Sequence, residues 1–444
     1  MTKMDIIEEN RPRPVSNGVK KVFFVGIGGI GISAIARMML FEGKEVLGSD
    51  MSEGEVTHEL KDLGIPVSLG QGFDLIPADT DLIVYTIAIK HYDPALLEQI
   101  FASGIPAKSY PEMLHIVTGG KYTIAVSGTH GKTTTTAMIA KILIEAKKDP
   151  SVIVGSLLKE YKSNLIVGGG EHFVVEACEY ERSFLNIEPK VLVITNIEAD
   201  HLDYYKDLAD IENAFTEMCM QTGSAVVCDP NDPVVRRVIQ DLRIEIVDYT
   251  KYFDKVPHLA VPGEHNRKDA AAALAVAHYI GIDSAVASAG IAQFTGTWRR
   301  LEMKGITKNG VIVYDDYAHH PTEVKASLEA LRELYPKGQK KIIIVFQPHL
   351  YSRTKALFTE FTTAFNEADA VYFLPIYFAR EVPDPTISSE ILAEAVAKNV
   401  PSARAFASFA EAEQFFAEAG LGQNDILVTM GAGEAYKIGD VFLK

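Results

Sequence analysis

Short apolar segments alternate with stretches of helical character along the first part of the chain. Up to about Thr118, the apolar segments are VFFVGI (22–27), EVLGSD (45–50) and LIVYTIAI (82–89). Strands that alternate with helices are typical of α/β folds built on a parallel sheet. The pattern therefore predicts a first domain with a parallel β-sheet.

The same alternation recurs twice further along the chain. The second block contains FVVEACE (173–179), VLVITNIE (191–198) and the alanine-rich helix DAAAALAVAHYIGI (269–282); the third contains VIVYDDYAHHPTEV (311–324), KIIIVFQPH (341–349), AVYFLPIY (370–377) and DILVTMGAG (425–433). Thr118–Lys121 has the composition of a linker, and the second block ends near Thr295–Trp298. We expect an α/β protein with three domains, at residues 1–118, 119–297 and 298–444.

Composition agrees with this organisation. The chain has 444 residues, 47% hydrophobic and 23% charged, which suits about three globular domains of roughly 150 residues each. Its 43 basic and 59 acidic residues give a formal net charge of −16. Binding a nucleic-acid backbone calls for clustered Lys and Arg, so we expect no nucleic-acid partner.

Nothing in the sequence indicates export or a membrane. The first twenty residues mix charges and prolines without the apolar stretch of a secretory signal, and the longest uncharged run, Val22–Ala36, is too short and too rich in glycine to span a bilayer. Cys178, Cys219 and Cys228 have neither metal-ligand spacing nor the even number of a disulfide framework. We expect a cytoplasmic protein whose cysteines are packing residues.

The segment YTIAVSGTHGKTTTT (122–136) has the pattern of a phosphate-binding loop between a strand and a helix. Such a loop needs small residues that bring backbone N–H groups to phosphate oxygens, a lysine for the β and γ phosphates and a hydroxyl for Mg²⁺. Lys132 and Thr133 fit the last two roles. Val126 stands where the common motif has its first glycine, so the loop is a shortened variant. The alternative is a Gly-Lys turn that only connects two elements.

A second glycine motif, Gly26-Ile27-Gly28-Gly29-Ile30-Gly31, lies between KVFFV and the apolar helix ISAIARMMLF. Its spacing is G-x-G-x-x-G, and Asp50 follows at the end of the next strand, where a dinucleotide fold places a ribose-binding carboxylate. A ligand with a phosphate and a ribose is therefore expected here. The alternatives are a glycine-rich turn without a ligand and an NAD-dependent dehydrogenase. A dehydrogenase would leave the phosphate loop without a role.

Three segments together resemble the Mur ligases of bacterial cell-wall synthesis. They are SGTHGKTTTT (127–136), TNIEADHLD (195–203) and DDYAHHP (315–321), and the resemblance covers nearly the whole chain. The opening G-I-G-G-I-G, the DDYxHHPTEV segment, Gln347-Pro348-His349 and Arg353-Thr354 are most similar to the branch that adds L-alanine. The branch that recycles murein tripeptide is the nearest alternative, and lacks the QPHxxxRT stretch.

The resemblance implies a Rossmann-like N-terminal domain that binds a UDP-sugar, a central domain similar to P-loop ATPases, and a Rossmann-like C-terminal domain that binds an amino acid. It also implies a reaction. ATP phosphorylates the lactyl carboxylate of UDP-N-acetylmuramate, and the amine of L-alanine attacks the acyl phosphate, giving UDP-N-acetylmuramoyl-L-alanine, ADP and phosphate for peptidoglycan synthesis. The expected cofactors are ATP and Mg²⁺, with the protein a monomer or a homodimer. The remaining alternative is a non-catalytic UDP-sugar-binding regulator.

Roles for the central domain follow from the same resemblance. Lys132, Glu176 and His201 are implied to be catalytic, and Thr133, Glu176 and His201 to hold metal; oxygen groups such as the first two suit Mg²⁺. ATP is implied to bind Gly128, Thr129, His130, Gly131, Lys132, Thr133, Thr134, His265, Asn266, Arg300 and Asp316. His201 has an alternative as a surface histidine bonded to its neighbours, Glu179 as a solvated charge, and Asn266 as a helix cap. For Arg299 and Arg300, the alternative is a solvated pair of charges at a linker.

The two substrates are assigned to the outer domains. The UDP-sugar is implied to contact Gly28, Gly29, Ile30, Gly31, Asp50, Thr86 and Ala88, and the amino acid to contact Tyr317, His319 and Arg353. Leu350 stands where many relatives have another arginine, which leaves Arg353 as the principal clamp for the amino-acid carboxylate. Cys178 and Glu181 replace common aspartates. No lysine occurs between Lys206 and Lys251, and this absence favours the alanine-adding branch over relatives with a carbamylated lysine.

Overall fold

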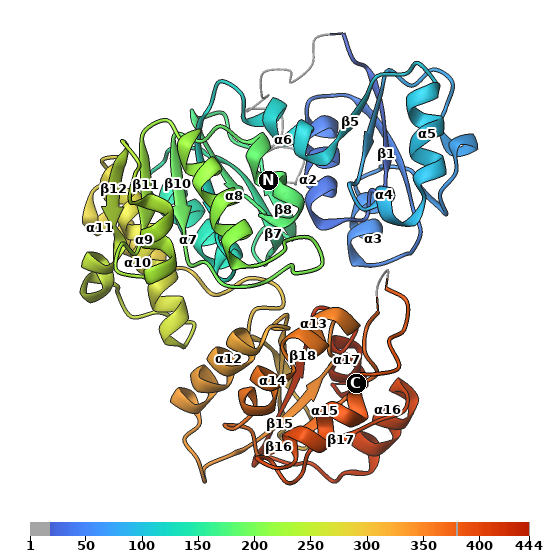
Figure 1. Ribbon diagram of the computed structural model, residues 1–444, viewed down its shortest axis with the longest axis vertical. Coiled ribbons are helices and arrows are strands. Elements are labelled where there is room, and N and C mark those ends of the chain that lie inside the picture. The colour runs from blue at the N-terminus through green and yellow to red at the C-terminus, as the bar shows by residue number, and fades with distance from the viewer. Residues whose placement is uncertain (1–17, 379–380, 444) are drawn as a thin grey trace. The chain divides into compact units, whose positions relative to one another are not determined.

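The computed structural model describes residues 18–378 and 381–443 (Figure 1). Most of the segment in which no secretory signal is expected, residues 1–17, lies outside the described residues. The chain divides into two compact units. Unit 1 contains the described residues up to Asp200 with Asp207–His258 and Asp269–Phe294, and unit 2 contains His201–Lys206, Leu259–Lys268 and Thr295–Lys444. Among the described residues, no helix has the length and apolar character needed to cross a membrane.

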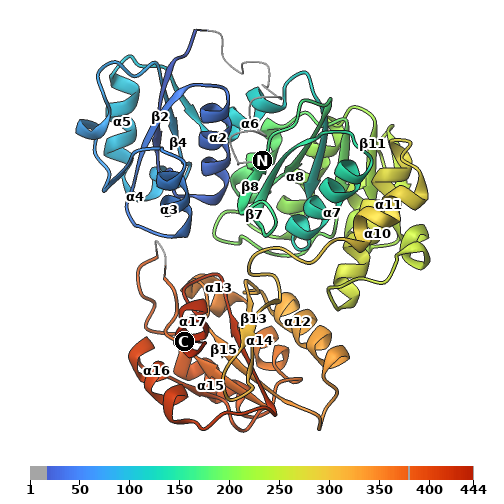
Figure 2. The same ribbon diagram turned by 180° about the vertical axis from the view of Figure 1, so that it is seen from behind.

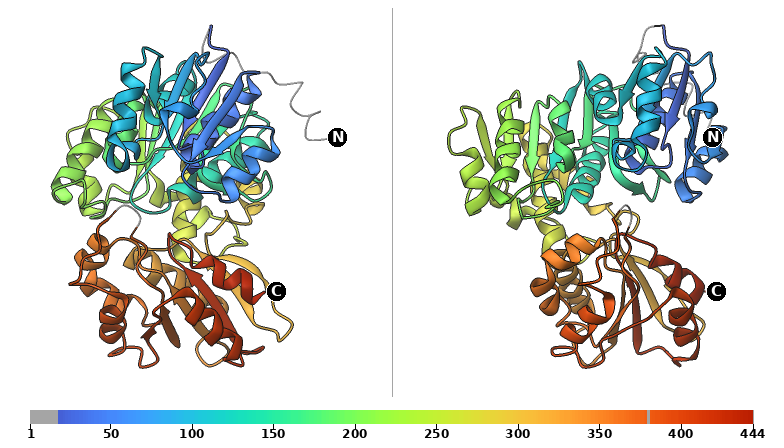
Figure 3. Two further views of the ribbon diagram at one scale, coloured as in Figure 1. Left: turned by 90° about the vertical axis from the view of Figure 1, so that its right-hand side faces the viewer. Right: turned by 45° about the vertical axis from the view of Figure 1, so that its right-hand side comes forward.

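Unit 1 begins with a five-stranded sheet in the order β3-β2-β1-β4-β5, in which every pairing is parallel (Figure 3). Its strands are β1 (Lys21–Val25), β2 (Glu45–Asp50), β3 (Val67–Leu69), β4 (Leu82–Tyr85) and β5 (Ala107–Ser109). Helices cover both faces of the sheet, so the central strands are continuous apolar runs. This order is that of a Rossmann-like sheet.

The helices of this part are α2 (Ile30–Phe41), α3 (Glu55–Asp62), α4 (Ile89–Tyr92), α5 (Pro94–Ala102) and α6 (Tyr110–Thr118), with a short 3₁₀ helix η1 (Phe73–Leu75). The predicted strand at 82–89 is too long, because β4 ends at Tyr85 and α4 begins at Ile89. A short apolar run has no periodicity that separates strand from helix. The chain therefore turns at Thr86, directly beside the glycine motif.

The second sheet of unit 1 has the order β12-β11-β10-β6-β9-β7-β8. Its strands are β6 (Tyr122–Ser127), β7 (Ser151–Leu158), β8 (Ser163–Ile166), β9 (His172–Glu176), β10 (Val191–Ile194), β11 (Ala225–Cys228) and β12 (Glu245–Asp248). Only the edge strand β8 is antiparallel among these pairings, because a short turn joins it to β7 as a hairpin. The strands expected at 173–179 and 191–198 end earlier, at Glu176 and Ile194, so the polar residues after them form loops.

The helices around the second sheet are α7 (Lys132–Glu145), α8 (Leu208–Met220), α9 (Pro233–Ile239), α10 (Glu264–Tyr279) and α11 (Ser284–Ala292), with the 3₁₀ segments η2 (Tyr180–Asn186) and η3 (Tyr249–Lys255). α11 lies against α7 (Figure 2). A Cβ on Gly290 of α11 would lie 2.8 Å from Cα of Ile142, so the absence of a side chain permits this close packing. The contact fixes the helix that follows the phosphate loop.

Unit 2 is built on a six-stranded sheet in the order β13-β14-β18-β15-β16-β17, parallel except for β13. Its strands are β13 (Glu302–Ile306), β14 (Ile312–Asp316), β15 (Lys341–Phe346), β16 (Ala370–Phe373), β17 (Arg404–Ala405) and β18 (Asp425–Met430). Its helices are α12 (Pro321–Leu334), α13 (Tyr351–Ala356), α14 (Phe358–Ala364), α15 (Ser389–Val396), α16 (Phe409–Glu418) and α17 (Tyr436–Phe442). The α/β class expected from the sequence is confirmed, while the boundaries at 118 and 297 stay predictions.

Candidate active site

The phosphate loop connects β6 to α7 and depends on two glycines. Gly128 has φ +133° and Gly131 has φ +82°, conformations that L-residues rarely adopt. A Cβ on Gly128 would lie 2.1 Å from Oγ1 of Thr195, and one on Gly131 would lie 2.3 Å from Oδ1 of Asp269. Both positions therefore require glycine, even though the first glycine of the common motif is absent.

The loop is held by the segment that follows β10. The Asn196 side chain accepts from His130 N and donates to His130 O, both at 3.0 Å. The backbone carbonyl of Asn196 accepts from Thr129 N at 3.1 Å, while Thr129 Oγ1 accepts from Glu198 N at 2.8 Å. Sequence reasoning did not single out Asn196. Its place in the TNIEADHLD segment was the available signal.

Lys132, the first residue of α7, lies over the loop. Its Nζ donates to the carbonyl oxygens of Gly128 and Thr129, at 2.5 and 3.1 Å, and lies 3.0 Å from both carboxylate oxygens of Glu179. Burial alone would lower the pKa of Lys132, but the carboxylates of Glu179 and Glu176 raise it above its usual value. The ammonium therefore stays charged. Glu179 is 3% exposed, so the solvated-charge alternative is wrong.

Thr133 and Glu176 lie side by side at the carboxyl end of the sheet. Thr133 Oγ1 donates to Glu176 Oε1 at 3.1 Å, and Gly155 N of β7 donates to Glu176 Oε2 at 2.6 Å. A Cβ on Gly155 would lie 2.4 Å from Glu176 Oε1, so a larger residue would displace the carboxylate. A hydroxyl and a carboxylate at this spacing fit Mg²⁺, which prefers oxygen ligands. No sequence motif indicated that Gly155 contacts this carboxylate.

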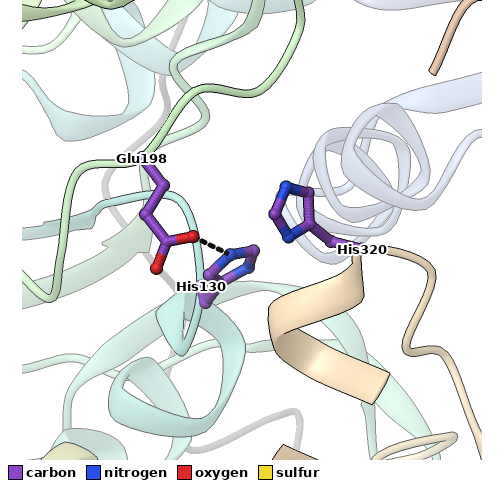
Figure 4. Close-up of side chains that lie close together, drawn as sticks. All are labelled: His130, Glu198 and His320. Atoms are coloured by element: carbon purple, nitrogen blue, oxygen red, sulfur yellow. Dashed lines mark ion pairs between the residues drawn. The ribbon is translucent and has the colours of Figure 1, made fainter. Parts of the chain in front are cut away.

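Two histidines were predicted to act near the phosphates. His130 Nε2 lies 3.5 Å from Glu198 Oε2 at the rim of the loop (Figure 4). His201 has a left-handed backbone, with φ 55°, and its carbonyl accepts from the N–H groups of Tyr204 and Tyr205 at 2.9 Å. Such a conformation is uncommon outside glycine and clusters at functional sites. His201 belongs to unit 2, and its participation as a metal ligand stays a prediction.

The glycine motif of the first domain lies between two polar side chains. Asp50 ends β2, and its Oδ2 accepts from Gly28 N at 2.8 Å. Gly26 has φ +76°, and a Cβ there would lie 2.5 Å from Cγ2 of Thr86. Thr86 Oγ1 in turn accepts from Ala88 N at 3.4 Å. The structure thus brings Asp50, the glycine loop and the turn at Thr86 together at the carboxyl ends of the strands.

The last glycine of the motif has a packing role. Gly29 is the N-cap of α2, with Ile30 the first helical residue. A Cβ on Gly31 would lie 2.6 Å from Cζ and 2.7 Å from the hydroxyl oxygen of Tyr110, the first residue of α6. Gly31 therefore lets α6 approach α2, as the third glycine of such motifs lets elements pack closely.

Of the predicted ATP residues in unit 2, Asn266 and Asp316 are buried, whereas His265 and Arg300 are partly exposed. Burial lowers the pKa of His265 to about 4, against the opposing effect of Glu323. Asn266 is the third residue of α10, so it does not occupy the N-cap position, and its Nδ2 donates to Pro262 O at 2.5 Å. Burial raises the pKa of Asp316 to about 6, although its carboxylate accepts a hydrogen bond from Ser327 Oγ at 2.5 Å.

The two arginines after Trp298 differ. Arg299 is 4% exposed; its Nε donates to Asp315 at 2.7 Å and its NH groups donate to the carbonyls of Gly431 and Gly433 at 2.7 and 3.1 Å. The idea of a solvated pair is therefore wrong for Arg299, because a buried guanidinium needs these acceptors. Arg300 is half-buried, 5.3 Å from the centre of the Tyr317 ring.

The residues predicted to bind the amino acid lie in or beside one aromatic cluster of unit 2. The ring of His319 lies 5.4 Å from that of Tyr317 and 5.8 Å from that of His349. An NH group of Arg353 lies 3.0 Å from His349 Nδ1. Leu350, before α13, is buried with φ +68°. The predicted Tyr317, His319 and Arg353 are thus brought together through His349.

The cysteines correct one expectation. Cys219 in α8 and Cys228 in β11 are buried, as packing residues are, but Cys178 is exposed. The reason is that β9 ends at Glu176, which leaves Cys178 in an irregular segment outside the sheet.

A parallel-sheet domain with a phosphate loop, a charged lysine and a hydroxyl–carboxylate pair defines a nucleotide-dependent phosphoryl-transfer protein. Family models match three parts of the chain: "Mur ligase family, catalytic domain" at 21–122, "Mur ligase middle domain" at 126–258 and "Mur ligase, glutamate ligase domain" at 299–433. Together with the relative described next, they show that the chain belongs to the Mur ligase family.

Relatives that match nearly the whole chain support the same family. A UDP-N-acetylmuramate-L-alanine ligase of Clostridium kluyveri is 40% identical, over 96% of this chain and 98% of the relative. The crystal structure of a UDP-N-acetylmuramate-alanine ligase from Thermotoga maritima matches with a TM-score of 0.78 and 26% identity, over 95% of this chain and 98% of that one. A murein peptide ligase from Psychrobacter arcticus has a TM-score of 0.72 at 21% identity, over 96% and 98%, and shows the fold alone.

Proposed function

We propose that this protein joins L-alanine to the lactyl carboxylate of UDP-N-acetylmuramate at the expense of ATP, in peptidoglycan synthesis. The observation that supports it most is the cluster at the phosphate loop: Lys132 beside Glu179, and Thr133 beside Glu176. These groups suit phosphoryl transfer, and the alanine-adding relatives match the chain from end to end. ATP and UDP-sugars are made in the cytoplasm, where we place the reaction.

The chemistry has two steps. A carboxylate oxygen of the lactyl group attacks the γ-phosphorus of ATP, the bond to the β-phosphate oxygen breaks, and ADP leaves. The uncharged amine of alanine then attacks the acyl carbon, and its nitrogen becomes positively charged. Phosphate leaves, and the nitrogen loses one proton to water as the amide bond forms. The protein's share is positioning and stabilising charge.

Each residue group has a part. Lys132 holds the γ-phosphate, and the loop N–H groups hold the phosphate oxygens. Thr133, Glu176 and His201 would hold Mg²⁺, which offsets the negative charge of the phosphates when bound. His265, Asn266, Arg300 and Asp316 take the nucleotide.

The substrates occupy the outer domains. Gly28 to Gly31, Asp50, Thr86 and Ala88 bind the UDP-sugar. Arg353 binds the carboxylate of alanine, beside Tyr317 and His319. Arginine suits a carboxylate because its planar fork can donate two parallel hydrogen bonds.

Phosphate release tests the proposal. The protein is incubated with ATP, Mg²⁺ and UDP-N-acetylmuramate, with L-alanine, glycine, L-serine or murein tripeptide added singly, and the product is weighed by mass spectrometry. Release with L-alanine and the matching mass gain are expected. Release only with tripeptide would assign the recycling reaction instead, and no release with any amine would favour the non-catalytic regulator.

A further inference from the structure

Asn164 of the second sheet enters the first domain beside the glycine motif. It lies on β8 and is 0% exposed. Its Nδ2 donates to the carbonyl oxygen of Ile30 and lies 3.1 Å from Ser33 Oγ. Both partners belong to the first turn of α2. Ile30 lies within the glycine motif predicted to bind the UDP-sugar, and Ser33 follows that motif.

The other end of the Asn164 side chain is fixed as well. Its Oδ1 accepts from Arg37, whose second NH group lies 2.7 Å from Glu59 Oε2 of α3. Arg37 is 1% exposed, and burial lowers its pKa while Glu59 raises it. The amide therefore uses both its donor and its acceptor within the first domain.

This polar network joins β8 of the second sheet to α2 and α3 of the first domain. Buried ionic groups are often no more stabilising than apolar residues of similar volume, but they can specify a single register. Apolar contacts between α2 and the hairpin would allow small displacements. Hydrogen bonds to one named carbonyl do not, since they lose strength steeply with poor geometry.

The β7–β8 hairpin also contacts Glu176, the carboxylate that we propose holds Mg²⁺. β8 pairs with β7, and Gly155 of β7 donates to Glu176. Glu176 accepts from Thr133 of the phosphate loop. A continuous set of contacts thus leads from Ile30, within the glycine motif, to the two oxygen groups that fit Mg²⁺.

We propose that Asn164 is a positioning residue that holds the UDP-sugar loop in register with the phosphate loop through the β7–β8 hairpin. This inference rests on the proposed function, in which the lactyl carboxylate must reach the γ-phosphate of ATP. A displacement of about 1 Å between reacting groups can cost on the order of 100-fold in rate. Asn164 touches no reacting atom; it acts through Ile30.

The test compares two substitutions at this position. Asn164→Asp keeps an acceptor for Arg37 but loses the donor to Ile30, whereas Asn164→Ala loses both. Asn186→Asp is the matched control, because the Asn186 side chain also donates to a carbonyl, that of Ser183, away from the glycine motif. For each variant we would measure KM for UDP-N-acetylmuramate and for ATP, kcat, the affinity of both ligands by calorimetry, and Tm.

We expect Asn164→Asp to lower kcat/KM for UDP-N-acetylmuramate by roughly 10- to 100-fold, with the affinity for a non-hydrolysable ATP analogue and the Tm close to those of the control. Asn164→Ala should lose as much activity and also melt earlier, because Arg37 keeps one acceptor fewer. Kinetics equal to the control would overturn the inference. So would an equal loss for all substrates that follows Tm, since this would show a structural role only.

The outcome can be separated from that of the proposed function. If the unsubstituted protein binds UDP-N-acetylmuramate but ligates no amine, the ligase proposal fails. Calorimetry then still decides the role of Asn164: weaker UDP-sugar binding in Asn164→Asp than in Asn186→Asp supports positioning of the loop, and equal binding overturns it.

Discussion

Replacing Lys132 by methionine separates the role we propose for it in phosphate binding from its role in stability. The Nζ of Lys132 lies 3.0 Å from Glu179, and the two side chains are 14% and 4% exposed. Methionine has similar length but no charge, so the substitution removes the cation expected at the γ-phosphate. It also leaves the Glu179 carboxylate buried without its counter-charge.

Both effects have a magnitude. Loss of one group that stabilises transition-state charge costs about 100- to 1000-fold in kcat, and we expect at least this. Removing one partner of a buried ion pair destabilises by about 3–5 kcal/mol, and the partial exposure of Lys132 places it near the lower limit. For a domain of this size, about 3 kcal/mol corresponds to a fall in Tm of roughly 6–12 °C.

The assay is a cycle of four proteins: unsubstituted, Lys132→Met, Glu179→Gln and the double variant. Calorimetry gives Tm, phosphate release gives turnover, and titration gives the affinity for UDP-N-acetylmuramate. We expect the double variant to recover most of the lost Tm, because the uncompensated charge is gone, while turnover stays lost. UDP-N-acetylmuramate should bind all four alike.

Three results would refute this reasoning. A double variant no more stable than Lys132→Met would show that Glu179 is not left with a costly charge. Turnover restored in the double variant would show that the cation is not needed at the phosphate. Loss of UDP-N-acetylmuramate binding in a folded Lys132→Met protein would contradict the assignment of that substrate to the first domain.

Three further substitutions probe the site. Gly155→Ala should raise the Mg²⁺ concentration for half-maximal activity by roughly 10- to 100-fold, because the new Cβ displaces Glu176. Gly54→Ala is the control: Gly54 has open space around it, so this substitution should leave that Mg²⁺ concentration unchanged in the same titration. Asp316→Asn should become more stable relative to the unsubstituted protein as pH rises from 4 to 8, measured by urea unfolding. The pKa of Asp316 is raised to about 6, so the stability that its protonation contributes is complete below the pKa of the unfolded chain and is lost as pH rises through 6. A difference in unfolding free energy that stays constant with pH would contradict this. Arg299→Met should lower the unfolding free energy by about 3–5 kcal/mol with KM for ATP unchanged, and a raised KM would instead indicate a phosphate contact.

Part of the site was predictable because it depends on local pattern. The phosphate loop, the glycine motif and Asp50 at a strand end are set by neighbours in sequence, and backbone N–H groups at a strand–loop–helix turn have only a few possible arrangements. The lengths of the strands after Tyr85, Glu176 and Ile194 were not predictable. Short apolar runs give no signal for where a strand must stop.

Single residues in unlike environments were the hardest to judge. Arg299 and Arg300 are adjacent and chemically identical, yet one is an ion-paired core residue and the other is half-buried beside Tyr317. Cys178 looks like the other two cysteines in the sequence, but lies outside the sheet. These differences depend on which distant residue, such as Gly431 or Gly433, supplies an acceptor.

The sequence by itself determined the α/β class, the two glycine loops and the residue types that phosphoryl transfer needs, because these follow from periodicity and from backbone geometry over a few residues. Tertiary structure alone decided that Glu179 neutralises Lys132, that Gly155 holds Glu176 and that Asn164 bonds to Ile30. Each of these contacts joins residues far apart along the chain. Their meeting depends on strand order and helix packing, which no local pattern encodes.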